Sequence, residues 1–462
     1  MLRKEQLEKY LSLCMRSEAD FAEIYEEREK TELISMLNGK TDDVNRKTIC
    51  GIGIRLYKGV QSVYAYGNDM SDKAILDLIE GLRHAIGTAD EGKGVVLEKK
   101  EYENLHPVKI DFEKTTLQEK TALLARGLKA ASETDERIVK TNGFLLNVKQ
   151  HVQISNSDGL LVEDTRVRTR MNVEAFSREG DNLQSGAHRP GAGMGLEFYE
   201  TTTPESIGRE AARTALVMLQ AGECPSGKMP VIIDNGFGGV IFHEACGHSL
   251  EATAVARDSS VFCNKLGQKI ASDCVSAVDD GTIPNAWGSE NVDDEGNFQK
   301  RRVLIENGVL KTYMVDRLNG RRMGVESTGS GRRESYRYEP TSRMSNTFIL
   351  PGRDKFEDML KGIQKGLYAK KMGGGSVNPQ TGDFNFSVEE GYLIEDGKIT
   401  KPVKGASLIG NGRDILMNID MVSDNLERSQ GMCGSCSGSV PTDVGQPAIR
   451  VSSITVGGTS NE

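Results

Sequence analysis

Histidine is rare in this chain of 462 residues, with six in total, yet two of the six lie only five positions apart. They enclose the segment His243-Glu244-Ala245-Cys246-Gly247-His248. Imidazoles are common ligands of transition metals, and a neighbouring carboxylate can accept a proton from water. The types and spacing of these residues therefore indicate a hydrolytic metal site. The alternative is a pair of ordinary packing or surface histidines.

The spacing of the two histidines places a demand on the backbone. In the zinc-protease motif H-E-x-x-H the ligands are four residues apart, which puts them about 40° apart around a regular helix. A five-residue spacing gives about 140°, so a regular α-helix would point the two rings apart. We therefore expect a π-type turn, or a helix that ends at Gly247, between residues 243 and 248.

A catalytic zinc usually takes three ligands from the protein and leaves one position for water. The thiols of Cys433 and Cys436 are the most concentrated candidates for the third ligand, and Glu244 is then the expected general base. A plain thiol pair and a redox C-x-x-C remain alternatives. Redox motifs of that kind lie where a strand meets a helix, whereas this run is rich in glycine and serine with no helical pattern after it.

The elements that must hold these residues are predicted to be mixed. The first half shows helical patterns, a hairpin and an antiparallel meander whose strands alternate polar and apolar residues, which predicts one face in water. The second half begins with a buried strand, then a glycine-rich turn into the histidine segment, and is mostly β afterwards. The expected fold class is α+β in two domains, an N-terminal α+β domain (1–225) and a β-rich C-terminal domain that carries the metal helix (226–462).

Specific local signals support these elements. They are a helix with Leu7, Tyr10, Leu11 and Cys14 on one face, a helix capped by Ser71, a helix over 114–132, the turn 156–159, a helix that starts at Thr203-Pro204, and hairpins at Asn307-Gly308 and Asp396-Gly397.

Composition narrows the class of protein. The chain has 58 basic and 67 acidic residues, a net charge of −9, which argues against binding to nucleic acid. Its eight cysteines are dispersed and the N-terminus lacks a signal-peptide pattern, so we expect a reducing, cytoplasmic environment. No apolar run is long enough to span a membrane.

The segment FHEACGHSLEA (242–252) closely resembles the metal site of the TldD branch of the TldD/PmbA peptidase family. The resemblance extends, in the same order, over 279–324, 327–352, 378–412 and 444–459. It implies a zinc-dependent peptidase of the cytoplasm that acts on short or unstructured peptides and binds one Zn²⁺ per chain. The implied ligands are His243, His248 and Cys433, with Glu244 as the general base. One departure is the run Cys433-Gly434-Ser435-Cys436, where the family commonly has a lysine and a glutamine after the cysteine.

The resemblance also implies a dimer, either of two identical chains or with a PmbA-like subunit (also called TldE) that lacks the motif. An alternative function is therefore a non-catalytic, peptide-binding subunit with a structural metal. Cys436 is an alternative thiol ligand. Glu251, three residues after His248, is a candidate to orient a ligand imidazole, and an ordinary carboxylate on a helix face is the alternative. Arg332, Arg333 and Arg343 are candidates to hold a peptide carboxylate, and solvated surface arginines are the alternative.

We expect a bound peptide to add a strand to an exposed sheet edge, because that mode reads backbone and tolerates varied side chains. The predicted strand over 382–388, beside a loop at 373–375, is one candidate edge.

Overall fold

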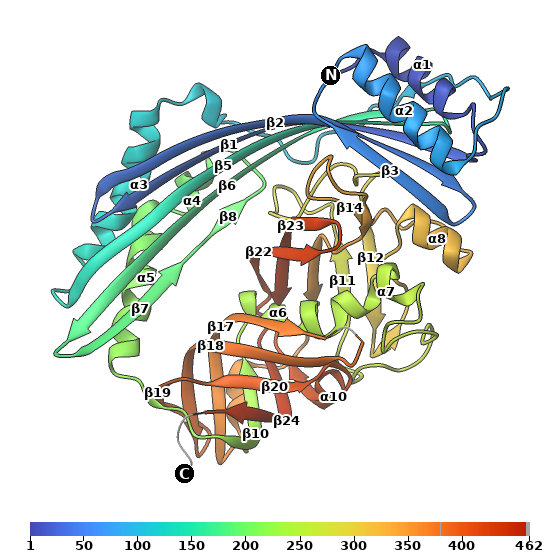
Figure 1. Ribbon diagram of the computed structural model, residues 1–462. Coiled ribbons are helices and arrows are strands. Elements are labelled where there is room, and N and C mark those ends of the chain that lie inside the picture. The colour runs from blue at the N-terminus through green and yellow to red at the C-terminus, as the bar shows by residue number, and fades with distance from the viewer. Residues whose placement is uncertain (379, 459–462) are drawn as a thin grey trace.

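The computed structural model describes residues 1–378 and 380–458. Runs of consecutive, mostly antiparallel strands are separated by groups of helices, which confirms the predicted α+β class. One large sheet from the N-terminal part arches over the C-terminal part, as Figure 1 shows. No helix in the described ranges is long and apolar enough to cross a membrane.

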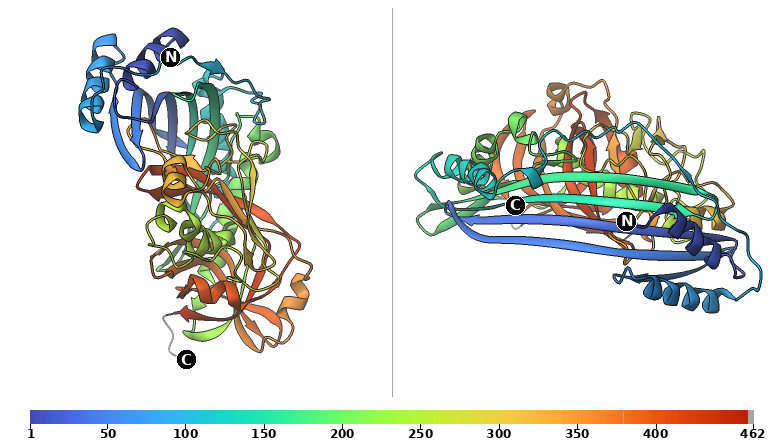
Figure 2. Two further views of the ribbon diagram at one scale, coloured as in Figure 1. Left: turned by 90° about the vertical axis from the view of Figure 1, so that its right-hand side faces the viewer. Right: turned by 90° about the horizontal axis from the view of Figure 1, so that it is seen from above.

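The arch is an eight-stranded sheet in the order β3-β2-β1-β5-β6-β4, with β7 and β8 also paired to β6. Its four longest strands run side by side, each antiparallel to its neighbours, which is clearest from above (Figure 2). The predicted turn at 156–159 joins two of them. The strands are β1 (Phe21–Leu37), β2 (Lys40–Lys58), β3 (Gln61–Gly67), β4 (Glu98–Lys99), β5 (Ile138–Asn156), β6 (Leu160–Glu179), β7 (Asn182–His188) and β8 (Gly191–Ala192).

Helices cover the two ends of this sheet. At one end the first helix buries Leu7, Tyr10, Leu11 and Cys14, as its spacing predicts, and the Ser71 side chain caps the second helix. At the other end two longer helices pack on β5, β6 and β7 around a separate apolar core. The helical elements are α1 (Lys4–Cys14), α2 (Asp72–Ile86), η1 (Phe112–Lys114), α3 (Leu117–Ser132), α4 (Phe198–Thr201) and α5 (Pro204–Leu219), the last capped by Thr203.

Residues after 221 form three further sheets. The eight-stranded one follows the order β17-β10-β24-β20-β18-β19-β9, with β21 paired to β24 and with β17 also paired to β18. Its strands are β9 (Gly222–Glu223), β10 (Gly227–Ile233), β17 (Lys365–Val377), β18 (Asp383–Glu395), β19 (Lys398–Lys404), β20 (Ser407–Asn411), β21 (Ile419–Val422) and β24 (Ile449–Gly457).

The six-stranded sheet follows the order β13-β12-β11-β16-β23-β22, and a two-stranded one lies beside it. Both hairpins predicted in this half are confirmed, with Asn307-Gly308 and Asp396-Gly397 at positive φ. The strands are β11 (Ala277–Asp280), β12 (Arg301–Glu306), β13 (Val309–Leu310), β14 (Gly331–Arg332), β15 (Thr341–Ser342), β16 (Asn346–Ile349), β22 (Glu427–Ser435) and β23 (Gly438–Gln446); helices are α6 (Val240–Phe242), α7 (Ala252–Val255), α8 (Arg317–Met323), α9 (Phe356–Leu360) and α10 (Gly412–Asn418).

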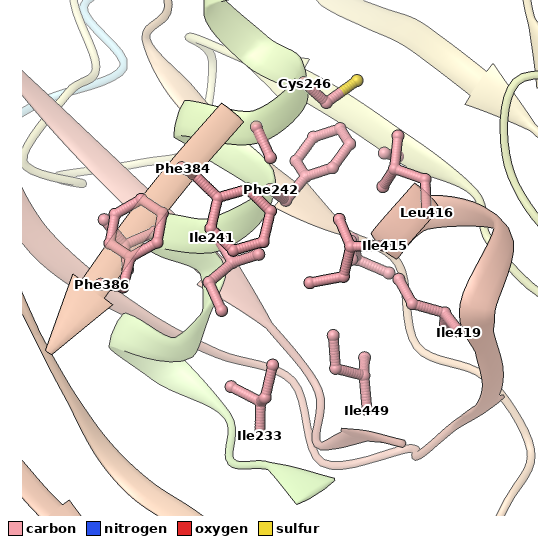
Figure 3. Packing of buried hydrophobic residues seen from close by; sticks show 14 of the residues in the cluster. Ile233, Ile241, Phe242, Cys246, Phe384, Phe386, Ile415, Leu416, Ile419 and Ile449 are labelled. Atoms are coloured by element: carbon pink, nitrogen blue, oxygen red, sulfur yellow. The ribbon is translucent and has the colours of Figure 1, made fainter. Parts of the chain in front are cut away.

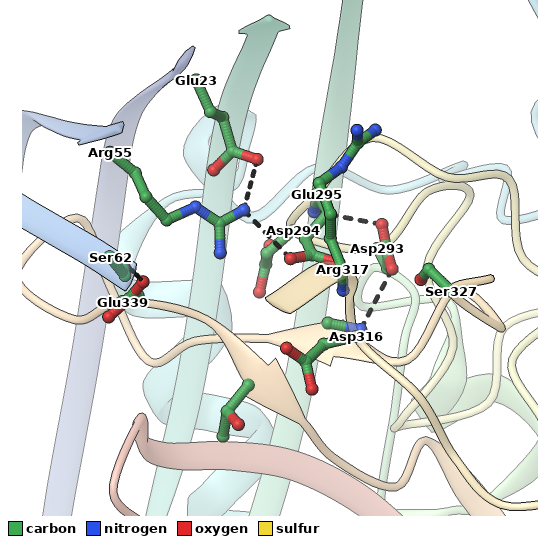
Figure 4. Close-up of polar contacts among 12 residues, drawn as sticks. Glu23, Arg55, Ser62, Asp293, Asp294, Glu295, Asp316, Arg317, Ser327 and Glu339 are labelled. Carbon is green, nitrogen blue, oxygen red and sulfur yellow. Dashed lines mark hydrogen bonds and ion pairs between the residues drawn. The ribbon is translucent and has the colours of Figure 1, made fainter. Parts of the chain in front are cut away.

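A buried network of arginines and carboxyl groups joins the arch to the part of the chain beneath it. Arg55 of β2 lies between Glu23 of β1 and Glu295, at 2.6 and 3.0 Å (Figure 4). Arg166 and Arg168 of β6 both reach Glu290. The prediction that this face of the sheet is in water is therefore wrong over this region, because the segment 287–295 covers it and supplies the carboxylates.

We propose that residues 1–225 and 226–462 are the two domains, of which 379 and 459–462 lie outside the described residues. The proposal rests on strand pairing: β1 to β8 pair only with one another in the described ranges, and so do the strands from β9 onward. The short strand β9 pairs with β19, so the exact limit falls near residue 222 if pairing alone decides it.

Candidate metal centre

The histidine segment is part of a short irregular helix that follows β10. A 3₁₀ turn, η2 (Gly236–Gly239), leads into α6, then η3 (His243–Gly247) and η4 (His248–Leu250). Ile241, Phe242 and Cys246 pack in the core among apolar side chains of β10, β18, α10 and β24 (Figure 3). This apolar face fixes the helix, and with it the position of the histidines.

The backbone departs from α geometry where the spacing predicts it. Residues His243–Gly247 form a π-helical turn. The centroids of the two imidazole rings of His243 and His248 are 5.1 Å apart. Gly247 has ordinary right-handed helical angles, so the helix does not end there. It is needed for space instead, because a Cβ there would lie 2.2 Å from Sδ of Met344.

Cys433 meets both histidines from the other side. It lies on β22, opposite Val440 of β23, and its side chain is buried. Its Sγ is 3.2 Å from Nε2 of His243 and 3.3 Å from Nε2 of His248. One ligand atom from each of the three residues lies within 4.8 Å of the others. Cys436 is exposed at the hairpin turn and is outside this group.

Electrostatic interactions within the site shift the pKa values of Cys433 and His248. Burial raises the pKa of the Cys433 thiol, but His243 and His248 outweigh burial and hold that pKa well below its usual range. Burial lowers the pKa of His248, but the charges of Glu251 and Cys433 outweigh it and raise that pKa well above the usual value. A thiolate is the form of cysteine that binds metals, so this environment favours the required state of the sulfur, while His248 must lose its proton when a metal binds.

Two carboxylates flank His248. Oε2 of Glu251 lies 3.1 Å from Nδ1 of His248, so this carboxylate can fix the ring and its tautomer. Oε2 of Glu244 lies 3.7 Å from Nε2 of the same ring, and the Glu244 side chain is partly exposed. The two glutamates thus contact different nitrogens of the ring: the buried Glu251 contacts Nδ1, and the partly exposed Glu244 lies near Nε2.

The three candidate arginines are held by contacts inside the protein. All are buried, and their guanidinium groups donate to protein acceptors. Arg332 donates to Glu290, Arg333 to Glu23, and Arg343 to the carbonyl of Cys433. This geometry gives no support to a role in holding a peptide carboxylate.

The prediction that a peptide adds to a sheet edge at 382–388 is wrong. These residues belong to β18, which has β17 on one side and β20 on the other, so the edge is already paired. Residues 373–375 are part of β17 rather than a loop.

The donor set fits a zinc ion. In a tetrahedral site with Zn–S of about 2.3 Å and Zn–N of about 2.0–2.1 Å, the sulfur and nitrogen are roughly 3.6 Å apart. The two observed sulfur–nitrogen distances are close to that value. His243, His248 and Cys433 are therefore residues that can hold a metal.

Comparison with known proteins places the chain in a family. Models of the PmbA/TldA metallopeptidase family match residues 22–89 (domain 1), 110–219 (central domain) and 226–458 (C-terminal domain). The chain belongs to the TldD/PmbA family of metallopeptidases.

Individual relatives agree with this assignment. The chain is 35% identical to a metalloprotease TldD homolog of Buchnera aphidicola, over 97% of this chain and 94% of that protein. It is 36% identical to a metalloprotease TldD homolog of Haemophilus influenzae, over 96% and 93%. The crystal structure of TldE from Thermococcus kodakarensis shares the fold, with a TM-score of 0.77, 21% identity and coverage of 98% and 99%.

Proposed function

We propose that the protein is a zinc-dependent metallopeptidase that hydrolyses short or unstructured peptides. The ligands are His243, His248 and Cys433, with one Zn²⁺ per chain, and Glu244 is the general base. The observation that carries the proposal is the convergence of two imidazole nitrogens on one buried thiol at 3.2 and 3.3 Å. The names of the curated relatives, which are metalloproteases, support the same activity.

The side chains around the donors have separate tasks in this mechanism. Zinc, when bound, polarises the scissile carbonyl and lowers the pKa of water. Glu244 accepts a proton from the attacking water as the new C–O bond forms. It donates that proton to the nitrogen of the leaving amine as the C–N bond breaks. Glu251 holds Nδ1 of His248, which directs Nε2 toward the ligand position.

A peptide is proposed to add to the free edge of β17. Residues 371–377 have β18 on one side, while β10 pairs with β17 only at 367–369 and no other described strand pairs with the later residues. β17 also contacts the π turn that carries His243. A strand added there reads backbone groups rather than side chains, which suits a peptidase of broad sequence tolerance.

The partner and the location belong to the same proposal. The fold shared with a TldE structure supports a TldD/TldE-type dimer, and a homodimer is the other arrangement. We place the protein in the cytoplasm, in line with its dispersed, unpaired cysteines. A non-catalytic, peptide-binding subunit with a structural metal is the alternative function.

Metal content measured together with cleavage of an unfolded peptide separates these functions. Wild-type protein is expected to carry one zinc per chain and to cleave, alone or with a PmbA-like partner. Glu244→Ala should keep the zinc and lose cleavage, whereas His243→Ala should lose both. Cleavage retained in Glu244→Ala would contradict the general-base role, and chelator-insensitive cleavage would contradict the metallopeptidase.

A further inference from the structure

Arg343 lies between the hairpin that carries Cys433 and the carboxylate of Glu251, which contacts His248. It follows β15, and its side chain has no exposed surface. Its backbone nitrogen donates to the carbonyl of Ser330 at 2.8 Å, which fixes the start of the side chain. A fully buried guanidinium must satisfy its donors within the protein, so its contacts show what it holds in place.

On one side Arg343 holds the hairpin that carries the thiol. Its Nη2 donates to the carbonyl of Cys433. Its Nη1 donates to Oγ of Ser437 at 2.9 Å and to the carbonyl of Gly438 at 2.8 Å. These acceptors lie at the ligand itself and at the turn between β22 and β23. The guanidinium therefore fixes the backbone from which the Cys433 side chain projects.

On the other side Arg343 faces the carboxylate that holds His248. Its Nε lies 3.9 Å from Oε1 of Glu251, whose other oxygen is 3.1 Å from Nδ1 of His248. Both Nε of Arg343 and Oε1 of Glu251 are buried, and neither has a hydrogen-bond partner in the described part of the chain. Opposite charges that face each other in this way attract strongly, because little water screens them.

We propose that Arg343 is a positioning residue that sets the distance between Cys433 and His248 and thereby tunes metal affinity. The inference rests on the proposed metal site. Groups behind metal ligands orient them, and changes to such groups typically weaken binding by about 10- to 100-fold. The planar fork of arginine can serve the hairpin and Glu251 at once, whereas the single ammonium of lysine cannot.

Arg332 is the matched control. It is also buried, and its Nη1 donates to the carbonyls of Met344 and Pro441 at 2.7 and 2.8 Å, so it holds the same hairpin from the other strand. Its Nη2 pairs with Glu290. None of its recorded contacts reaches a proposed ligand or Glu251. A loss of general packing should therefore affect Arg332→Lys and Arg343→Lys alike, while a loss of ligand positioning should affect only the second.

The test is titration of metal-stripped full-length protein with Co²⁺ alone, followed by absorption spectroscopy and by competition with a chelator. Wild type and Arg332→Lys should bind one Co²⁺ with affinities within about threefold and the same thiolate-to-cobalt band. Arg343→Lys should bind one Co²⁺ about 10- to 100-fold more weakly, with shifted ligand-field bands. Thermal unfolding confirms that each variant is folded.

Glu251→Gln keeps the volume and a hydrogen bond to His248 but removes the charge that faces Arg343, and it serves if Arg343→Lys does not fold. It should weaken Co²⁺ binding in the same direction, by about tenfold. Wild-type affinity and spectra in both variants, or equal weakening in Arg332→Lys, would overturn the inference. If wild-type protein shows no thiolate-to-cobalt band, the proposed metal site itself fails, which is a different result.

Discussion

The metal centre and the ion network beneath the arch both bury ionisable side chains, but they combine them differently. In the network each carboxylate meets guanidinium groups: Glu290, for example, contacts Arg166, Arg168 and Arg332. At the metal centre three metal-binding donors point at one another, and an open carboxylate, Glu244, lies beside them.

The difference teaches how to separate structure from chemistry among buried charges. Charges that neutralise one another hold segments together, and their perturbed pKa values need no further explanation. Donors that converge on one point can bind a cation between them. Perturbed groups occur in both regions, so perturbation alone does not mark the functional one.

The largest expected effect comes from removing the thiol. Cys433→Ser should weaken zinc binding by more than about 100-fold, because even changes behind the ligands cost 10- to 100-fold. Peptide cleavage should fall in parallel. Cys436→Ser is the control and should change neither, since its side chain is exposed and outside the donor group. Zinc per chain and competition with a chelator measure zinc binding in the two variants. Weaker zinc binding in Cys436→Ser than in Cys433→Ser would make Cys436 the ligand.

A change in the network should act on stability instead. Glu290→Gln removes the shared partner of three buried arginines and should lower the free energy of unfolding by about 3–5 kcal/mol. Zinc per folded chain should stay at one. Chemical denaturation provides the measurement. The more exposed pair Arg126–Glu205 offers a control, because Glu205→Gln should cost less than about 1 kcal/mol. Equal costs in the two variants would contradict the distinction between the regions.

The network should also give stability a pH dependence of a definite sign. Burial, opposed by Arg55 and reinforced by Asp316 and Asp293, raises the pKa of Glu295 from 4.5 to about 8. The folded state thus holds this proton more tightly than the unfolded chain. The stabilisation that this proton gives is complete below the pKa that Glu295 has in the unfolded chain. It is lost as the pH rises through the pKa that Glu295 has in the folded state.

The free energy of unfolding should therefore decrease as the pH rises from about 5 to about 8. Glu295→Gln, which stays neutral, should flatten that slope. Denaturation curves collected across this range check the prediction, and an unchanged slope in the variant would contradict it. Only one proton is involved, so the slope cannot exceed about 1.4 kcal/mol per pH unit.

Local features of this fold could be predicted from the sequence. The apolar spacing of the first helix, the caps at Ser71 and Thr203, and the Asn-Gly and Asp-Gly hairpins depend on residues near one another in the chain. The π turn was also predictable, since five-residue spacing in a helix leaves few other ways to bring two rings together.

Features that depend on distant partners could not be predicted. Arg166 and Arg168 show the alternation of a strand with one face in water. No residue near them in the sequence indicates that Glu290 is their partner. Residues 382–388 read as a strand, but only the sheet order shows that both sides are paired. Arg343 was singled out by residue type, while its attachment to the hairpin of Cys433 required the fold. The pairing of Ser437 and Gly438 with that arginine was missed for the same reason.

The central claim is that two histidines and one cysteine bind a single zinc ion. X-ray absorption spectroscopy of the zinc-loaded, full-length protein tests it most directly. We expect one zinc per chain with one sulfur neighbour at about 2.3 Å and nitrogen or oxygen neighbours at about 2.0–2.1 Å, and loss of the sulfur signal in Cys433→Ser. A zinc shell without sulfur, or a sulfur signal that survives in Cys433→Ser, would contradict it.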